Sequence, residues 1–501
     1  MSGLFSRKPI AEETSRGLVR SLGAGDLIML AIGAVIGAGI FASLGTAAAG
    51  ETGPGGEVIR AGAGPALVLS FILLGVVCGL AALCYAELAS MIPQAGSAYA
   101  YTYATLGELM AWVIGWALVL EYAIGNVAVA VAWSGYFTSL LSGWGIFLPG
   151  WLTHGYFQVT LGSDPAIRAL AESAPHFAGF PILVNLPAFA ITALVTGVLL
   201  MGVKESARAN AVMVILKLLV LAFFVVVGSS HIDPANYKPF APNGFRGIHQ
   251  GAAIVFFAYI GFDAISTAAE ETKNPQRNLP LGILGGLGIC TLIYVIVGVV
   301  ATGLVPYQQL AGADPLARAL EIAGLPTASW IVAAGAVVSM TAVLLVFQYG
   351  QTRIFFGMGR DGLLPRWSTK VHPRTRIPHI STILIGVVVG VGALIAEENS
   401  IYDLVNIGTL AAFFLVCIGV LVLRMREPAL VRPFRVPMIW LVAPLGALAC
   451  LFTIAGLPSR AYQMFGWWMA AGLIFYFLYG YRHSVLRTGK RVPVEEWEFK
   501  G

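Results

Sequence analysis

Long apolar runs alternate along the chain with short stretches that carry the charged residues. A helix needs about 20 mostly apolar residues to cross a hydrocarbon core about 30 Å thick. Runs of that kind are expected at about 26–49, 64–92, 107–141, 181–202, 209–229, 248–271, 279–305, 327–357, 380–396, 402–424, 437–456 and 464–481. The pattern therefore predicts an all-α integral membrane protein with about 12 transmembrane helices.

Composition and charge agree with this pattern. Of the 501 residues, 58% are hydrophobic and 11% are charged, whereas a soluble domain carries roughly 25% charged residues. Most of the 30 Lys and Arg residues fall on segments that would be cytoplasmic if the N-terminus is cytoplasmic, which predicts that both termini lie inside. The net charge of +5 then reflects orientation and attraction to anionic membrane lipids rather than a nucleic-acid site.

Several kinds of chemistry have no sequence support. The five cysteines lie inside apolar runs without CxxC spacing, which predicts small core residues and no metal site. The polar residues 1–25 do not form a cleavable signal and are expected to be a cytoplasmic tail. Because the chain has no phosphate loop and no HExxH or GxSxG motif, we expect neither an ATP-driven pump nor an enzyme, and no cofactor. Energy for transport would come from an ion gradient.

The first run contains three glycines within seven residues, Gly33, Gly37 and Gly39, each of which costs a helix about 1 kcal/mol. One interpretation is that Gly33 and Gly37 form a face for close helix packing. The other is that the helix unwinds around Gly37 to Gly39 and aims free N–H groups at an anionic substrate group.

The sixth run supplies a counterpart at Gly261, where the helix can break and leave the carbonyls of Phe257, Ala258 and Ile260 facing a cation. Two breaks five runs apart are typical of transporters built from inverted repeats, which bind substrate between the breaks. Donors at one break and acceptors at the other match the carboxylate and the ammonium of an α-amino acid. We therefore expect an amino acid rather than a sugar.

Four motifs resemble the amino-acid/polyamine/organocation (APC) superfamily of permeases. They are GAVIGAGIF, LCYAELASMIPQAGSAYAY, FFAYIGFDAISTAAEETKNPQRNLP and YGQTRIFFGMGRDGLLP. More narrowly, they resemble bacterial members of the cationic amino acid transporter group, and the resemblance covers nearly the whole chain. It implies a bacterial plasma-membrane permease that works by alternating access.

The resemblance also implies a LeuT-type fold with discontinuous helices 1 and 6. Inverted repeats would occupy 26–229 and 248–424, two extra helices 437–481, and a cytoplasmic tail 482–501. The carboxylate-binding backbone would be Ile36, Gly37, Ala38 and Gly39, and the amino-binding carbonyls would be Phe257, Ala258 and Ile260. The insert GETGPGGEVIRAG between the first two runs departs from the family pattern. We expect it to lengthen an external loop and to leave the site untouched.

Lys217, Glu121 and Asp263 are charged residues that lie well inside predicted spans, where they are costly and are candidates for function. Lys217 either snorkels to the interface or, as the resemblance implies, replaces the sodium ion of other members and couples transport to protons. Glu121 either takes part in the site or fixes helix packing through an internal hydrogen bond. Asp263, just after Gly261, is expected to cap the second half of the broken helix, with gating as the alternative.

Phe347 falls where the family's pocket controls side-chain size, and it would leave little room for a long substrate. We therefore expect proton-coupled symport of small or medium neutral amino acids ahead of arginine or lysine. The alternatives are an amino acid or polyamine exchanger, a cationic amino acid transporter, and a membrane amino acid sensor without flux. A small single-span partner or an oligomer is a further expectation that the sequence leaves open.

Overall fold

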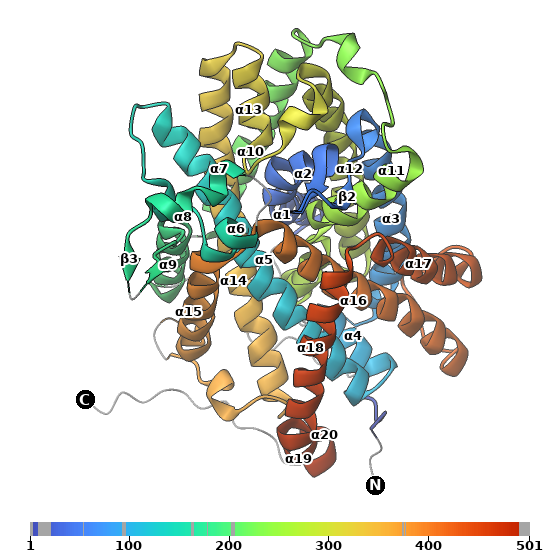
Figure 1. Ribbon diagram of the computed structural model, residues 1–501. Helices are drawn as coiled ribbons and strands as arrows, with labels where there is room; N and C mark the ends of the chain where they lie inside the picture. Colours follow the sequence, from blue (N-terminus) through green and yellow to red (C-terminus); the bar gives the residue numbers. More distant parts are fainter. Residues whose placement is uncertain are drawn as a thin grey trace.

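The structure, a computed structural model, is mainly helical (Figure 1). It describes residues 4–8, 22–53, 55–92, 97–161, 165–177, 179–201, 206–372, 375 and 377–489. Within these ranges the side chains of residues 165, 206–211, 267, 270 and 271 are not described. The predicted tails at 1–25 and 482–501 lie largely outside the described residues.

Apolar helices long enough to cross a bilayer form the body of the molecule, because a helix satisfies its own backbone hydrogen bonds where water is absent. The described chain has 7 single helices of this kind, or up to 9 if two bent pairs each count as one span. The single helices are η2 with α3 (Gly64–Met91), α5 (Glu108–Ser142), α10 (Ser206–Ser229), α11 with its continuation (Gly244–Ser266), α12 (Pro275–Leu304), α14 (Pro326–Arg360) and α16 (Glu398–Arg426).

The two bent pairs and two shorter apolar helices complete this set. They are α1 (Ala24–Val35) with η1 and α2 (Gly39–Ala49), α17 (Ile439–Ile454) with α18 (Ser459–Phe475), α9 (Leu186–Met201) and α15 (His379–Ile395). Each run predicted from the sequence coincides with one helix or one broken helix. The membrane-protein fold is thus confirmed, while the count of 12 crossings stays a prediction.

The two longest helices, α5 and α14, have 35 residues each and interlock through glycines. A Cβ added at Gly125 of α5 would lie 3.2 Å from the ring of Phe347, and one at Gly350 of α14 would lie 2.8 Å from the ring of Tyr122. Small residues let helices approach closely inside a membrane. This pair forms the middle of the bundle, against which α9, α15 and α16 also pack (Figure 1).

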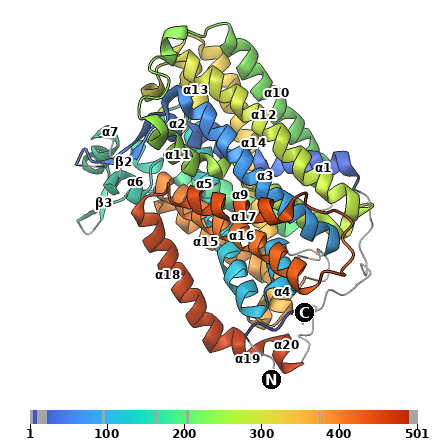
Figure 2. The ribbon, with the colours of Figure 1, turned by 90° about the vertical axis from the view of Figure 1, so that its right-hand side faces the viewer.

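The shorter elements lie mainly at the two ends of the bundle. They are β1 (Gly50–Thr52), β2 (Val58–Ala61), α4 (Ser97–Thr105), η3 (Gly150–Leu152), α6 (Tyr156–Leu161), α7 (Pro165–Arg168), α8 (Leu170–Ser173), β3 (His176–Phe177), β4 (Phe180–Pro181), η4 (Pro234–Tyr237), η7 (Tyr307–Leu310), α13 (Pro315–Ile322), η8 (Arg366–Thr369), η9 (Tyr476–Gly480), α19 (Tyr481–His483) and α20 (Val485–Thr488). We call the end with the β1–β2 hairpin and α13 the hairpin end, and the end with residues 4–8 and α20 the tail end (Figure 2).

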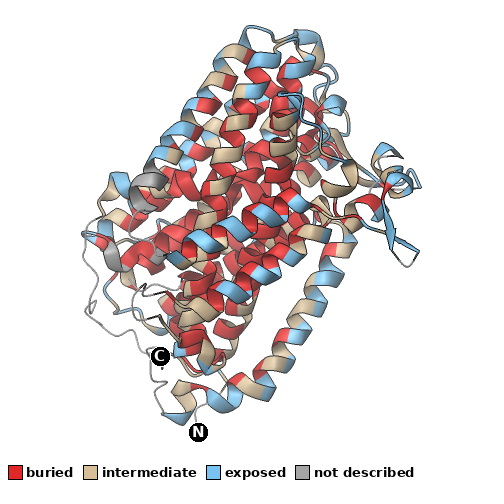
Figure 3. Cartoon of the chain, turned by 90° about the vertical axis from the view of Figure 1, so that its left-hand side faces the viewer, coloured by how far each residue is buried: buried red, intermediate tan, exposed pale blue. Residues whose placement is uncertain are grey.

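Helix α18 turns back from α17 by 113° and runs along the side of the bundle (Figure 2). Its outer surface is exposed, as at Trp467, whereas the middle of the bundle is buried (Figure 3). The chain that follows is tied back at Glu108, the first residue of α5. This buried carboxylate accepts hydrogen bonds from Tyr476, Ser484 and Arg487. A buried carboxylate is stable when several donors surround it.

Candidate functional site

The first broken segment interrupts its helix at the predicted place. Helix α1 ends at Val35, and Ile36 is extended, with ψ of 104°. The helix resumes at η1 (Gly39–Ser43) and continues as α2 (Leu44–Ala49), bent by 44° from α1. The predicted unwinding around Gly37 to Gly39 is confirmed, and it starts one residue earlier.

The second broken segment lies between α11 (Gly244–Val255) and η6 (Phe262–Glu271). A turn of 3-10 helix, η5 (Phe256–Tyr259), tightens the end of the first half, and Ile260 is extended. Gly261 has φ of +112°, a left-handed conformation that glycine adopts without strain. The predicted break at Gly261 is confirmed.

The two breaks meet inside the bundle. A Cβ added at Gly39 would lie 2.2 Å from the Cα of Ala258, so the two backbones touch. A Cβ added at Gly261 would lie 2.9 Å from the carbonyl oxygen of Ala34. Glycine is thus required at both crossing points for steric reasons. All seven residues predicted to bind substrate are buried around this contact, namely Ile36, Gly37, Ala38, Gly39, Phe257, Ala258 and Ile260.

Lys217 of α10 binds the open end of α1. Its Nζ donates to the carbonyl oxygens of Gly33, at 2.9 Å, and Ile36, at 2.8 Å, and the residue is fully buried. The last carbonyls of a helix have no partner within the helix and carry partial negative charge, so a cation is favoured there. The snorkelling alternative is therefore wrong for this lysine, whereas its role in coupling stays a prediction.

Other polar residues at the breaks were missed by the sequence reasoning. The hydroxyl of Tyr294 on α12 lies 3.0 Å from the carbonyl oxygen of Val35 and 2.8 Å from that of Ala258, so it can donate to either break. The Nδ2 of Asn406 on α16 lies 2.8 Å from the oxygen of Ala253 at the end of α11. Both are hydrogen-bonding residues inside apolar runs, a signal that was available in the sequence.

Asp263 and Glu121, the two acidic residues singled out in the sequence, interact electrostatically with each other. Asp263 accepts a hydrogen bond of 3.1 Å from Ser97 through Oδ2, while its buried Oδ1 has no hydrogen-bond partner. Glu121 is buried on α5 and interacts electrostatically with Asp263 and the side chain of Thr409. Gly261 occupies the N-cap position of η6, and Asp263 lies in the first turn, where it interacts with the backbone of Gly261 and Ala264. Its predicted capping role therefore stays a prediction.

Phe347 packs in the middle of α14, with its ring 5.4 Å from that of Tyr122 and against Gly125 of α5. Val343, one turn earlier on α14, meets the first break, since a Cβ at Gly37 would approach it within 2.8 Å. Ser339 of the same helix also lies there, with its Oγ 3.5 Å from the carbonyl oxygen of Ile36. Phe347 thus lies one turn from the wall of the break. Its role in selectivity stays a prediction.

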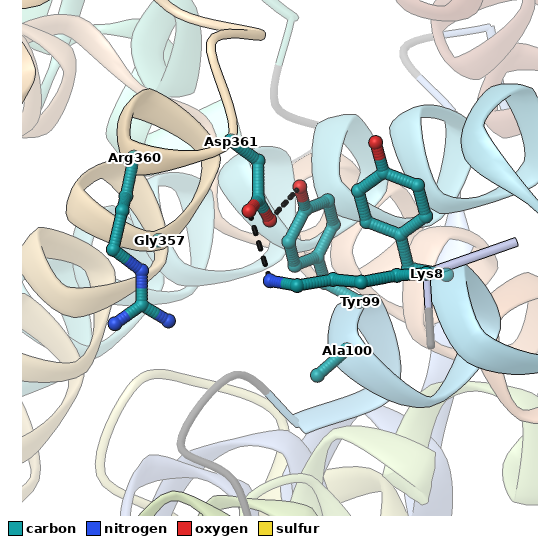
Figure 4. A pocket seen from close by; sticks show the side chains of 7 residues that line it. Lys8, Tyr99, Ala100, Gly357, Arg360 and Asp361 are labelled. Atoms are coloured by element: carbon teal, nitrogen blue, oxygen red, sulfur yellow. Dashed lines mark hydrogen bonds and ion pairs between the residues drawn. The ribbon is translucent and has the colours of Figure 1, made fainter. Parts of the chain in front are cut away.

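Ionic contacts close the tail end of the bundle. Lys8 and the hydroxyl of Tyr99 both bind Asp361 at the end of α14, at 2.9 Å and 2.8 Å, beside a pocket also lined by Arg360 (Figure 4). Glu87 on α3 is fully buried and forms a two-pronged ion pair with Arg424. The pocket beside Lys8 and Asp361 lies away from the two helix breaks, so we do not assign the substrate to it.

Comparisons with known proteins identify relatives of this chain. The model of the amino acid permease family matches residues 22–479. A methylthioribose transporter of Bacillus subtilis is 44% identical over 490 residues, 97% of this chain and 100% of the relative. The branched-chain amino acid permease BcaP of the same organism is 45% identical over 489 residues, 96% and 99% of the two chains. A vacuolar cationic amino acid transporter 4 of Arabidopsis thaliana is 40% identical over 443 residues, 85% and 68% of the two chains.

The fold and the paired breaks define an integral membrane transporter, not an enzyme. The chain belongs to the amino acid permease family of the APC superfamily. Both the family and its bacterial relatives agree with the resemblance found in the four sequence motifs.

Proposed function

We propose that this permease carries small or medium neutral amino acids across the bacterial plasma membrane by proton-coupled symport and alternating access. The observation that carries the proposal is the meeting of two helix breaks, with Gly39 against Ala258, inside a bundle that buries both. Broken helices that meet in mid-membrane are how inverted-repeat transporters build a substrate site. The proposal includes 12 spans in a LeuT-type arrangement, with the tail end in the cytoplasm.

Backbone groups are proposed to hold the part that all amino acids share. The helix that starts at Gly39 directs unpaired N–H groups and a partial positive charge toward the break, where a carboxylate fits. Ile36, Gly37 and Ala38 complete this end. The carbonyls of Phe257, Ala258 and Ile260 accept hydrogen bonds from the ammonium. The hydroxyl of Tyr294 has one proton, and when it donates this proton to the carbonyl of Val35 the carbonyl of Ala258 is left for the substrate.

Side-chain preference is proposed to favour neutral, branched substrates. The relative BcaP, 45% identical along nearly all of both chains, is named for branched-chain amino acids, and its name supports valine, leucine and isoleucine as first candidates. Phe347, one turn from Val343, adds bulk beside the break. Glu121 is the residue that would favour the alternative of cationic amino acids, because a buried carboxylate near the site could pair with a long basic side chain.

Binding is the first experiment. The purified chain is heated with each of the twenty amino acids, with leucinol and isobutylamine, which lack a carboxylate, and with methylthioribose. We expect valine, leucine or isoleucine to raise the melting temperature, since a ligand that binds only the native state stabilises it. The amines without a carboxylate should not. A rise with methylthioribose alone would contradict the amino acid assignment and favour the activity for which the other Bacillus relative is named.

Phe347→Ser tests whether the ring of Phe347 limits the size of the substrate side chain. Removing the ring should widen the range of bound side chains toward methionine, phenylalanine or arginine, with affinities for these changed by about tenfold or more. Ligand-induced shifts in melting temperature measure this range. Val337→Ser, on the same helix away from the break, is the control, and an unchanged range in Phe347→Ser would rule out the ring as the size filter.

Lys217→Ala tests the coupling. In proteoliposomes the native chain should accumulate substrate when an inward proton gradient is imposed, and the variant should lose that response while still exchanging internal for external substrate. Full gradient-driven uptake by Lys217→Ala would sink the coupling role. Uptake that needs internal substrate even in the native chain would favour an exchanger, and binding without any flux would favour a sensor.

A further inference from the structure

The insert between the first two spans folds into a hairpin whose arginine is buried. Strands β1 and β2 pair so that Glu51 lies opposite Arg60, and only 2% of Arg60 is exposed. From the sequence, this insert is expected to lengthen an external loop and to leave the site untouched. A buried arginine is costly unless it is paired, so the partners of Arg60 determine what the hairpin does.

Those partners belong to helices that the hairpin ties together. The Nη2 of Arg60 lies 2.5 Å from Oδ1 of Asp403 on α16, which is also fully buried. Its Nη1 lies 3.3 Å from the carbonyl oxygen of Gln250 on α11, and the side chain of Gln250 accepts from the N–H of Ala61 at 2.7 Å. The hairpin therefore joins the first half of the second broken segment to α16.

A second ion pair joins the hairpin to α18. Glu51 binds Arg460 of α18 at 2.9 Å, and Arg460 also lies 3.8 Å from Glu397 at the start of α16. Four atoms of this network are buried without a hydrogen-bond partner, namely Glu51 Oε2, Arg60 Nε, Asp403 Oδ2 and Arg460 Nε. Such atoms would regain hydrogen bonds if water entered. The tie therefore rests on the pairing of charges more than on complete hydrogen bonding.

The base of the hairpin is fixed to the first broken segment. The N–H of Ala63 donates to Ala47 of α2 at 2.9 Å, and a Cβ at Gly62 would lie 2.4 Å from the carbonyl oxygen of Ala48. Helix α2 continues η1, which begins at Gly39, the point of contact between the breaks. A movement of the hairpin therefore moves the half-helix that carries Gly39.

We propose that the paired strands β1 and β2 are a latch that holds the hairpin end closed through the ion pair between Arg60 and Asp403. The latch rests on the proposed function, because alternating access requires this end to open to the outside. Opening separates α2 and α11 from α16, and Arg60 must then leave Asp403 and enter water. A hairpin that is only a permanent tie between these helices is the competing description.

Thiol labelling tests the latch without any need for flux. Thr46 of α2 contacts Asn399 of α16 through a hydrogen bond of 3.2 Å, so Thr46→Cys reports on the seam that must open. The five native cysteines are buried, and the native chain measures their background. In sealed vesicles with the hairpin end outside, Asp403→Asn should raise the labelling rate of Thr46→Cys by an impermeant maleimide by about fivefold or more.

Asp403→Asn alone leaves the buried Arg60 without its ionic partner and could therefore fold poorly. A second variant removes Arg60 as well: because Gly50 and Ala61 are paired partners in the hairpin, two glycines can replace residues 51–60 in the Asp403→Asn chain. We expect the same increase in labelling. Arg168→Gln, which changes an exposed arginine, is the control and should leave the rate unchanged. An unchanged rate in both latch variants, or an equal increase in the control, would overturn the proposal.

The labelling result is independent of the substrate assignment. If the chain binds no amino acid, the proposed function fails while the labelling rate still decides whether the hairpin end is latched. If the chain binds and transports amino acids but labelling does not change, the latch alone fails. In the uptake assay Asp403→Asn should lower kcat about fivefold with little change in KM, because closing the outer end becomes unfavourable.

Discussion

Single residues explain where the two segments break and why they can meet. The glycines at 37, 39 and 261 were visible in the sequence, because glycine in an apolar helix is costly and needs a reason. The structure supplies that reason as a backbone contact at Gly39 and a left-handed conformation at Gly261. The partners of Lys217 could not be predicted, since Gly33 lies 184 positions away in the chain.

Gly39→Ala should damage the protein far more than an alanine elsewhere. The new methyl group would overlap the Cα of Ala258, and overpacking of this kind costs about 1–3 kcal/mol or more. We expect a lower melting temperature and loss of uptake. Gly79→Ala is the matched control, because a Cβ there meets nothing within 4 Å and α3 should gain helix propensity. Equal behaviour of the two variants would contradict the backbone contact between the breaks.

At the scale of elements, the apolar pattern predicted every long helix, because burial in lipid demands long apolar runs. It did not predict α4, the small helices at 150–173 or the β1–β2 hairpin, whose residues are mixed in polarity. Periodicity gives no signal for such segments, and only contacts with the bundle determine their structure. The hairpin illustrates this, since Arg60 is buried by helices that lie far along the chain.

Helix α13 at the hairpin end should show a pH-dependent stability. Burial raises the pKa of Asp314, just before this helix, although Ser139 and Arg318 lower it in part. The folded chain then binds this proton more tightly than the unfolded chain, so the charged form costs stability at neutral pH and the cost disappears as pH falls through the folded pKa.

Asp314→Asn should therefore raise the melting temperature at neutral pH, and this advantage should shrink as the pH is lowered toward about 4.5. Melting curves of the detergent-solubilised chain over that range measure the difference. Glu172→Gln, which alters an exposed acid outside this helix, is the control. An advantage that grows on acidification would mean that Asp314 is stabilised by Arg318 rather than penalised by burial.

At the scale of the whole molecule, ionic ties close both ends of an apolar bundle. Arg60 and Asp403 lie at the hairpin end, and Lys8 and Asp361 lie at the tail end. The sequence placed Arg60 in the insert and Lys8 in the N-terminal tail, but it could not pair them with their partners, which are more than 300 positions away. In an alternating-access protein the two ties should act in opposition, since one end opens when the other closes.

Lys8→Gln should consequently lower the labelling of Thr46→Cys. Weakening the tail end favours states in which the hairpin end stays closed, and we expect a decrease of about twofold, because the Lys8 side chain is partly exposed and its ion pair is weak. The impermeant maleimide assay in sealed vesicles measures it. Lys273→Gln, an exposed lysine of the tail end, should have no effect. An unchanged rate would mean that the two ends are not coupled, and an increase would mean that they do not act in opposition.

The contact between the backbones of Gly39 and Ala258 also competes with substrate binding. At the proposed site a substrate must displace one stretch of backbone from the other before it can bind. Its apparent affinity is then the intrinsic affinity reduced by the fraction of molecules in which the breaks are parted. A mutation that changes only this fraction would tighten or weaken binding of all substrates by one common factor and leave their ranking unchanged.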